Sequence, residues 1–217
     1  MILVGLASAI GAPVGVLAGI YLSEFEGNGI FPSVVRFFND VLVGLPSIVI
    51  GIVAYITLVL TLGSFSVWAG AFALSIIMIP IVTRVTEETL KIVPNSVREA
   101  GQSLGIPKRK IILRIVLPSA KSGVITGVIL AIARIAGETA PLIMTILGTD
   151  LFFTTLRGPV DALPLRIWRL ASQPYEYAHS FGWGAALILI LLVIGLSLGL
   201  RLVAHKRGFK IGTINAG

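Results

Sequence analysis

The sequence predicts an all-α membrane protein that crosses the bilayer about five times as one domain. Of its 217 residues, 56% are apolar and only 12% are charged, whereas an ordinary soluble domain is roughly half apolar and a quarter charged. The apolar residues gather in long runs, and many of the basic residues gather in one connection between those runs. This composition excludes a typical soluble enzyme. It also excludes a disordered chain, which needs low hydrophobicity and high net charge.

Five apolar stretches are long enough to cross a bilayer, which takes roughly 20 mainly apolar residues. They cover residues 2–22, 41–62, 65–82, 123–147 and 183–200. The first stretch lacks the basic n-region of a secretory signal peptide and is too long for an h-region, so we interpret it as a span. It carries glycines at steps of four, Gly11, Gly15 and Gly19, which predict a smooth helix face for close packing.

The distribution of lysine and arginine predicts the orientation. Alternation of five spans places the loop 23–40, the loop 83–122 and the tail from Arg201 on one side, with 13 basic residues between them. The opposite side, which includes the outer loop 148–182, has three. Because cytoplasmic connections are rich in Lys and Arg, we expect the basic loop 83–122 and the C-terminus to be cytoplasmic.

The sequence gives no sign of catalytic, metal or cofactor chemistry. It contains no cysteine, and its two histidines, His179 and His205, lie at opposite ends of an apolar segment. It has no phosphate-binding loop and no zinc-protease or hydrolase motif. The net charge of +7 is divided among long apolar runs, which does not indicate a nucleic-acid partner. We therefore predict no catalytic residues, no metal and no cofactor.

The basic loop 83–122 contains residues that typically start and end helices, in an order that predicts two short helices joined by a turn. Ser96 followed by Glu99 fits a capping box that starts a short helix ending at Leu104. Gly105 suits the left-handed residue that ends a helix, and Pro107 suits the first position of a second helix that stops before Pro118. We expect a rigid cytoplasmic knob.

This loop resembles the EAA loop of ABC-importer permeases. The matching pattern is Glu99-Ala100-Gly101, three residues, Gly105, nine residues, and Ile115-Val116-Leu117-Pro118. The only departure is Gly101, where the family pattern has a second alanine. The resemblance implies a type I ABC-importer permease fold, in which the short helix docks on a separate ATPase subunit. The implied coupling residues are Glu99, Ala100, Gly101, Gly105, Leu117 and Pro118.

Two further stretches, residues 44–51 and residues 133–142, resemble the phosphate-specific permeases, and the second is closer to their A-type subunit. Residues 168–174 also resemble that subunit. The resemblance implies a permease of an ATP-driven phosphate importer in a prokaryotic cytoplasmic (inner) membrane. Its implied partners are a second homologous permease, ATPase subunits and an external phosphate-binding protein. Members of this family usually have another hydrophobic helix before the position of Met1.

Two other functions stay open at this point. One is a permease for another oxyanion, such as molybdate, sulfate or a phosphonate. The other is an ion-coupled transporter or channel, but such a protein would have no use for an ATPase-docking knob.

Arg134 and Glu138 are the charged residues inside the fourth apolar stretch. Charged residues within the bilayer are costly and normally face a bundle interior or a wet cavity. We expect Arg134 near the middle of the span, with Glu138 four residues on and on the same helix face. The pair either neutralises itself for packing, or Arg134 meets a phosphate oxyanion while Glu138 tunes it. The family resemblance favours the second interpretation.

The outer loop contains apolar residues around Arg166 and Arg169. This pattern fits an amphipathic segment at the outer membrane interface. It also fits a contact with a solute-binding protein, and the two interpretations are compatible.

Overall fold

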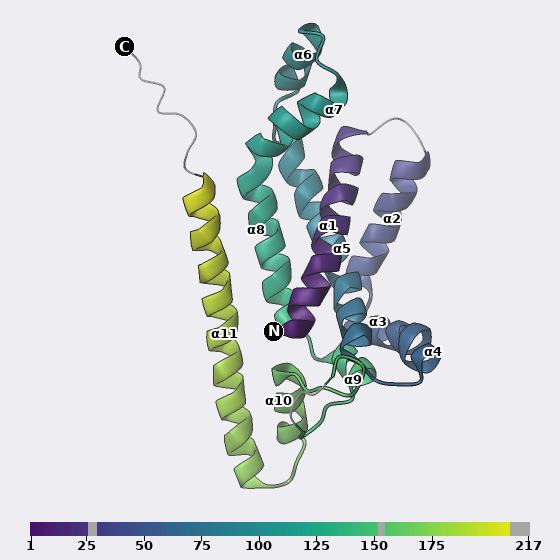
Figure 1. Cartoon of the computed structure of the whole chain (residues 1–217), viewed down its shortest axis with the longest axis vertical. Coiled ribbons are helices and arrows are strands. Elements are labelled where there is room, and N and C mark those ends of the chain that lie inside the picture. The colour runs from purple at the N-terminus through teal and green to yellow at the C-terminus, as the bar shows by residue number, and fades with distance from the viewer. Residues whose placement is uncertain (26–29, 152–154, 209–217) are drawn as a thin grey trace.

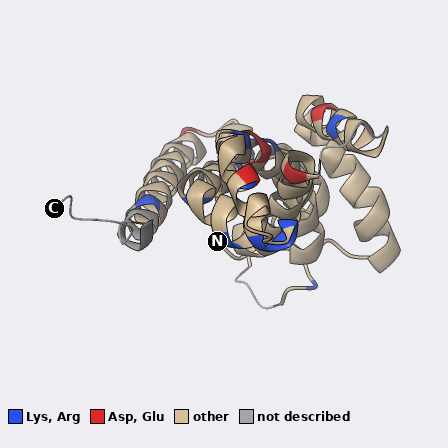
Figure 2. Cartoon of the chain, turned by 90° about the horizontal axis from the view of Figure 1, so that it is seen from above, with Lys and Arg blue, Asp and Glu red and all other residues tan. Residues whose placement is uncertain are grey.

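The computed structural model describes residues 1–25, 30–151 and 155–208, and the side chains through residue 202. Four helical runs are long and apolar enough to cross a membrane (Figure 1). They are α1 (Ile2–Glu24), α5 (Val67–Lys91), the run Lys108–Ala136, and Glu176–Leu202 of α11 (Glu176–Gly208). The side chains of Lys206, Arg207 and Lys210, which belong to the basic tail predicted to be cytoplasmic, lie outside the described part of the chain. Seen along the long axis, charged residues occupy little of the ribbon (Figure 2).

The stretch predicted as a second span, 41–62, is not one straight helix. Helix α2 (Ile30–Gly44) and the run Ser47–Leu62 meet at an angle of 105°. The second run consists of α3 (Ser47–Ala54), a π-helical turn η1 (Tyr55–Val59) and α4 (Leu60–Leu62). Pro46 precedes α3 with an extended ψ of 133°. A residue before proline is disfavoured in the α region, and proline lacks the N–H that would continue the helix.

Most of the loop predicted at 23–40 also belongs to helix α2. Its polar side chains find partners on α5, which lies beside it. Arg36 Nε donates to Glu87 Oε1 at 2.9 Å, and Asn39 Nδ2 donates to the Pro80 carbonyl at 3.4 Å. These contacts give hydrogen-bond partners to polar side chains that, in the sequence alone, indicate a solvated connection.

The predicted glycine face of α1 is confirmed as a packing surface. Gly11, Gly15 and Gly19 are buried against α5. A Cβ atom on Gly15 would lie 2.7 Å from Val82 Cβ, and one on Gly19 would lie 2.6 Å from Thr86 Cβ. Real Cβ atoms do not approach this closely, so α1 and α5 are as near to each other as they are because these positions are glycine.

The predicted end of a helix before Pro118 is wrong. Helix α7 (Lys108–Ile111) continues through a π-helical turn η2 (Ile112–Val116) into α8 (Leu117–Ala136). Proline in a helix removes one hydrogen bond and crowds the carbonyl four residues earlier, which here belongs to Arg114. A π-helical turn shifts the bonding pattern by one residue at that place, so the helix passes through the proline.

The main hydrophobic core lies between α5 and the helices α1, α8 and α9 (Ala140–Thr145). The described residues form no strand, and one isolated bridge joins Leu147 and Val160. Helix α6 (Asn95–Ser103) and α7 lie at one end of the molecule, and α9 and α10 (Leu163–Ala171) lie at the other (Figure 1). The largest fully buried side chains of this core are Val67, Leu74, Met78, Val82, Ile135, Ile146 and Leu165.

Candidate functional site

The α6–α7 corner, residues 95–111, is an ordered turn between two short helices. Gly105 has a φ of 72°. The Ile106 N–H donates to the Gly101 carbonyl at 3.1 Å, and the Gly105 N–H donates to the Gln102 carbonyl at 2.8 Å. This pair of bonds is the Schellman motif, which needs a left-handed residue where glycine stands. The predicted left-handed glycine is confirmed.

The predicted capping box at the start of α6 is wrong. Pro94 occupies the N-cap position with a φ of −58° and a ψ of 142°, and no side chain caps the helix. Because the helix begins at Asn95, Ser96 already lies within its first turn instead of before it. Glu99 is exposed on the surface of α6. Its carboxylate is therefore free of a capping role.

Gly101 has a structural reason to be glycine. It is buried, and a Cβ atom there would lie 2.9 Å from Ile111 Cδ1. Ile111 is itself 2% exposed and belongs to a second apolar cluster beneath the corner with Leu90, Val116 and Ala120. The absent methyl group lets α6 rest directly on α7.

Arg98 locks α6 to the ends of α1 and α5. Its guanidinium donates hydrogen bonds to both carboxylate oxygens of Glu24, from Nη2 to Oε1 at 2.5 Å and from Nε to Oε2 at 3.0 Å. It also donates to the Val93 carbonyl at 2.6 Å and the Leu90 carbonyl at 3.0 Å. The Glu24 side chain is only 2% exposed. Hydrogen bonding to Glu24 raises the pKa of Arg98 above its ordinary value, so the guanidinium remains protonated.

The sequence alone does not mark Arg98 or Glu24 as functional residues. Glu24 is the first charged side chain of the chain and follows the uncharged residues 1–23. Arg98 directly precedes the Glu-Ala-Gly segment. The position of Glu24 at the end of a long apolar run is a signal in the sequence that this acid is unusual. Only the fold shows that Arg98, 74 positions away, pairs with it.

The rest of α6 faces outward. Glu99, Ala100 and Gln102 are exposed, and Leu104 at the corner is 78% exposed. Leu117 packs against the second apolar cluster, whereas Pro118 is exposed on the continuous helix. The corner therefore has one face anchored to the bundle and one face free in this chain.

Arg134 and Glu138 lie together, but not as predicted. Arg134 stands in the last turn of α8, and Glu138 lies beyond the helix end. Arg134 Nε is 3.7 Å from Glu138 Oε1, and their side chains are 61% and 16% exposed. The expected position of Arg134 near the middle of a straight span is wrong. In a continuous helix Pro141 would crowd the carbonyl of Gly137, and here α8 ends at Ala136 and α9 starts at Ala140.

The break after α8 contacts α3 closely. A Cβ atom on Gly51 would lie 2.7 Å from Pro141 Cα. Residues 44–51 and 133–142 therefore meet in space, although they are far apart in the chain. Both segments carry the same family resemblance, and their contact brings Pro141 of α9, three residues after Glu138, against α3.

The sequence matches the family described as "Binding-protein-dependent transport system inner membrane component" over residues 11–208. The chain belongs to this permease family. The permease is 42% identical over 201 residues to the phosphate transport system permease protein PstA of Yersinia pestis, covering 93% of this chain and 68% of that protein. It is 45% identical over 197 residues to PstA of Xylella fastidiosa, covering 90% and 69%.

Solved structures show the same fold as the permease. The MetNI methionine ABC transporter, inward facing, matches with a TM-score of 0.78 at 15% identity, covering 94% of this chain and 90% of that one. An amino acid ABC transporter with histidines matches with a TM-score of 0.68 at 19% identity, covering 94% and 88%. The predicted all-α, type I importer fold is confirmed, and so is the resemblance to ABC-importer permeases.

Proposed function

We propose that this permease is the transmembrane subunit of an ATP-driven inorganic phosphate importer. It forms half of the translocation pathway and couples to a separate ATPase, which carries out ATP hydrolysis. The observation that carries the proposal is the identity of 42–45% to phosphate permeases over at least 90% of this chain. The fold, with its exposed corner at one end, supports it.

The α6–α7 corner is the docking element in this proposal. The exposed residues of α6 enter a cleft on the ATPase, with Glu99 and Ala100 on the contact face. Movement of α6 passes into α1 and α5 because Arg98 ties it to Glu24 and to the Leu90 carbonyl. Gly105 holds the angle between α6 and α7, while Gly101 and Leu117 seat the corner on its apolar base.

Arg134 is the pathway residue, with Glu138 as its counter-ion. The Arg134 side chain is 61% exposed in the isolated chain and only loosely paired at 3.7 Å. Such exposure suits a side chain that faces a pathway between two permease subunits. A guanidinium fork binds phosphate oxygens in a bidentate manner, and a nearby carboxylate keeps that binding weak enough for release.

The proposed assembly contains a second homologous permease, ATPase subunits and an external phosphate-binding protein. It lies in a prokaryotic cytoplasmic membrane, with the α6–α7 corner and the C-terminus in the cytoplasm. The excess of lysine and arginine at the corner supports this orientation. The spans 2–22, 65–82, 123–147 and 183–200 overlap the four straight candidate helices.

The anion can be tested directly, because sulfate or molybdate would also fit a guanidinium. The permease is purified with its partners in nanodiscs, and ATP hydrolysis is measured with binding proteins loaded with different anions. We expect stimulation by the phosphate-loaded binding protein. Stimulation by a sulfate- or molybdate-loaded binding protein, with none by the phosphate-loaded one, would assign the permease to that other oxyanion.

A further inference from the structure

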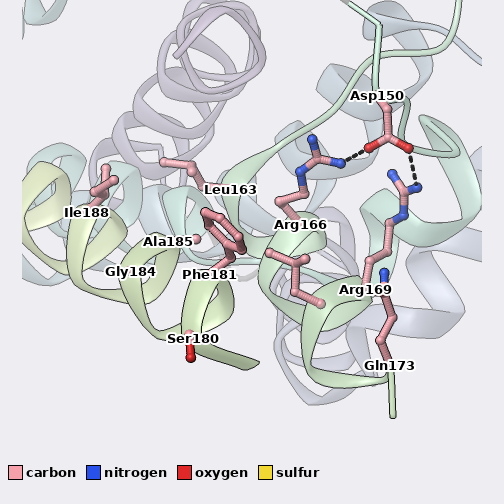
Figure 3. Close-up of a pocket in the computed structure, with 11 residues that line it drawn as sticks. Asp150, Leu163, Arg166, Arg169, Gln173, Ser180, Phe181, Gly184, Ala185 and Ile188 are labelled. Carbon is pink, nitrogen blue, oxygen red and sulfur yellow. Dashed lines mark hydrogen bonds and ion pairs between the residues drawn. The ribbon is translucent and has the colours of Figure 1, made fainter. Parts of the chain in front are cut away.

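Two arginines of α10 point at one carboxylate, that of Asp150 (Figure 3). Arg166 and Arg169 are three residues apart, so they share a helix face. Arg166 Nη1 donates to Asp150 Oδ1, and Arg169 Nη2 lies 3.3 Å from Asp150 Oδ2. Each guanidinium thus takes a different oxygen of the same anionic group. This is the arrangement in which two arginines bind an oxyanion.

The two arginines are held in place by contacts other than Asp150. Arg166 Nε lies 3.3 Å from Asp161 Oδ2. Arg169 lies against the left-handed backbone at Gly148, where a Cβ atom would be 3.0 Å from Arg169 Nη1. That Nη1 atom is buried and has no hydrogen-bond acceptor among the described residues. A buried guanidinium nitrogen without an acceptor is costly, and a bound anion would satisfy it.

The carboxylate between them is the least constrained member of the cluster. The Asp150 side chain is 70% exposed, compared with 36% for Arg166 and 31% for Arg169. The hydrogen bond from Arg166 lowers the pKa of Asp150, so the carboxylate is ionised at neutral pH. With Asp150 and Asp161 both present the cluster is neutral. Rotation of Asp150 into solvent would leave one net positive charge on the arginine pair.

A cavity of about 540 Å³ opens beside this cluster, between α10 and α11. Asp150, Arg166, Arg169, Gln173 and Ser180 supply its polar lining, and Phe181 and Ile188 of α11 are among its apolar lining residues. Helix α10, which carries both arginines, is at the end of the molecule opposite α6 (Figure 1), and this is the outer end in the proposed orientation. A concave site with a few converging polar groups fits a small ligand better than a flat protein contact.

We propose that Arg166 and Arg169 form a weak phosphate-binding site at the outer mouth, and that Asp150 occupies it as an exchangeable stand-in. Incoming phosphate displaces the Asp150 carboxylate and takes its hydrogen bonds from both arginines. Asp161 stays in place and keeps Arg166 oriented. This inference rests on the proposed phosphate function. Competition with Asp150 keeps the affinity low, as a site of passage requires.

The test is equilibrium binding of radiolabelled inorganic phosphate to the assembled complex in nanodiscs, without binding protein or ATP. All variants carry Arg134→Gln, so that the other proposed arginine does not contribute. Asp150→Asn should tighten phosphate binding about tenfold, because it removes a competing charge-assisted contact. A folding defect cannot produce that gain. Arg166→Gln with Arg169→Gln should abolish the binding.

Arg157→Gln, an exposed arginine of the same loop, is the matched control and should leave binding unchanged. Unchanged or weaker binding in Asp150→Asn would overturn the site. So would a double arginine variant that binds phosphate normally but no longer responds to the phosphate-loaded binding protein, since the arginines would then contact that protein. Stimulation of wild-type ATP hydrolysis by phosphate-loaded binding protein is measured separately, so the importer proposal and this site can fail independently.

Discussion

Glu24 and Arg98 show how much one buried ion pair determines at the corner. Glu24 is almost completely buried, and Arg98 forms an ion pair with it. Arg98 also donates hydrogen bonds to two carbonyl groups, those of Leu90 and Val93, at the end of α5. Removing one partner of such a pair leaves a buried charge or unsatisfied donors, which costs about 3–5 kcal/mol. The sequence shows both residues but not their contact, because the pairing depends on the return of the chain through α5.

We expect Glu24→Gln to loosen α6 from the bundle. The uncompensated Arg98 should lower the thermal unfolding temperature of the assembled complex and weaken coupling of ATP hydrolysis to uptake. Glu88→Gln is the matched control, because the Arg84–Glu88 pair lies on the surface with side chains 60% and 63% exposed. Exposed pairs contribute about 0–1 kcal/mol. Equal effects of the two substitutions would contradict the locking role of Glu24.

The Arg134–Glu138 pair gives different mutant patterns for its two interpretations. If the residues only neutralise each other, the double variant Arg134→Gln, Glu138→Gln should recover much of the uptake lost in either single variant. If Arg134 meets the anion, the double variant should stay inactive, and Arg134→Lys should be impaired because it lacks the fork geometry. We expect the second pattern. Phosphate uptake is measured together with co-purification of the ATPase, and substantial uptake by an assembled double variant would remove Arg134 from the pathway.

At the scale of elements, the sequence predicted helices better than it predicted their breaks. The left-handed turn at Gly105 follows from local residue chemistry and was predicted. The passage of the chain through Pro118 and the bend at Pro46 were not. Proline permits either a kinked continuous helix or a sharp break, and packing decides between them. The apolar cluster under α7 favours continuation in one case, and the contact of α3 with α9 accompanies the break in the other.

Gly105 offers a test of the corner, because its backbone conformation, and not the space around it, limits which residue can stand there. A Cβ atom there would meet nothing within 4 Å, while its φ is 72°. Gly105→Asn should retain coupling, since asparagine tolerates the left-handed region. Gly105→Pro should abolish ATP-driven uptake, since proline cannot take a positive φ and loses the N–H that bonds Gln102. A cysteine at position 102 should crosslink to the ATPase in Gly105→Asn. Normal uptake in Gly105→Pro, with no crosslink from positions 99–105 in the wild-type background, would remove the docking role of α6.

The contact of α1 with α5 can be tested with two alanine substitutions on one helix. Gly15→Ala would place Cβ 2.9 Å from the Ile79 carbonyl oxygen, whereas Gly5→Ala meets nothing within 4 Å. Overpacking of this kind typically costs about 1–3 kcal/mol. Gly15→Ala should lower the unfolding temperature of the purified complex, and Gly5→Ala should not. A complex that is equally stable with both substitutions would show that α1 can move away from α5 at no cost.

The whole molecule has two chemically distinct ends. The α6–α7 end carries Lys108, Arg109, Lys110 and Arg114 on exposed positions, and the other end carries the Asp150–Arg166–Arg169 cluster. The orientation rests on this asymmetry and on the positive-inside rule. The sequence predicted the sides through its basic loop. It did not predict that residues 44–51 and 133–142 meet, since that contact requires the tertiary fold.

Cysteine labelling can test the orientation without background, because the chain contains no cysteine. A single cysteine at position 103, on α6, should react only with reagent supplied from the cytoplasmic side. One at position 157, an exposed residue before α10, should react only from outside, with denatured protein as the control for full labelling. Reaction of position 103 with an impermeant reagent in intact cells would reverse the orientation.

In the proposed importer, the permease couples ATP hydrolysis to the movement of phosphate. It is tested most directly in proteoliposomes that contain the permease with its partner permease, ATPase and binding protein. Labelled phosphate, sulfate and molybdate are supplied in parallel, each with and without hydrolysable ATP on the ATPase side. We predict ATP-dependent accumulation of phosphate against its gradient and no accumulation of the other two anions. Accumulation of phosphate that is equal without ATP, or ATP-driven accumulation of sulfate or molybdate but not phosphate, would contradict the account.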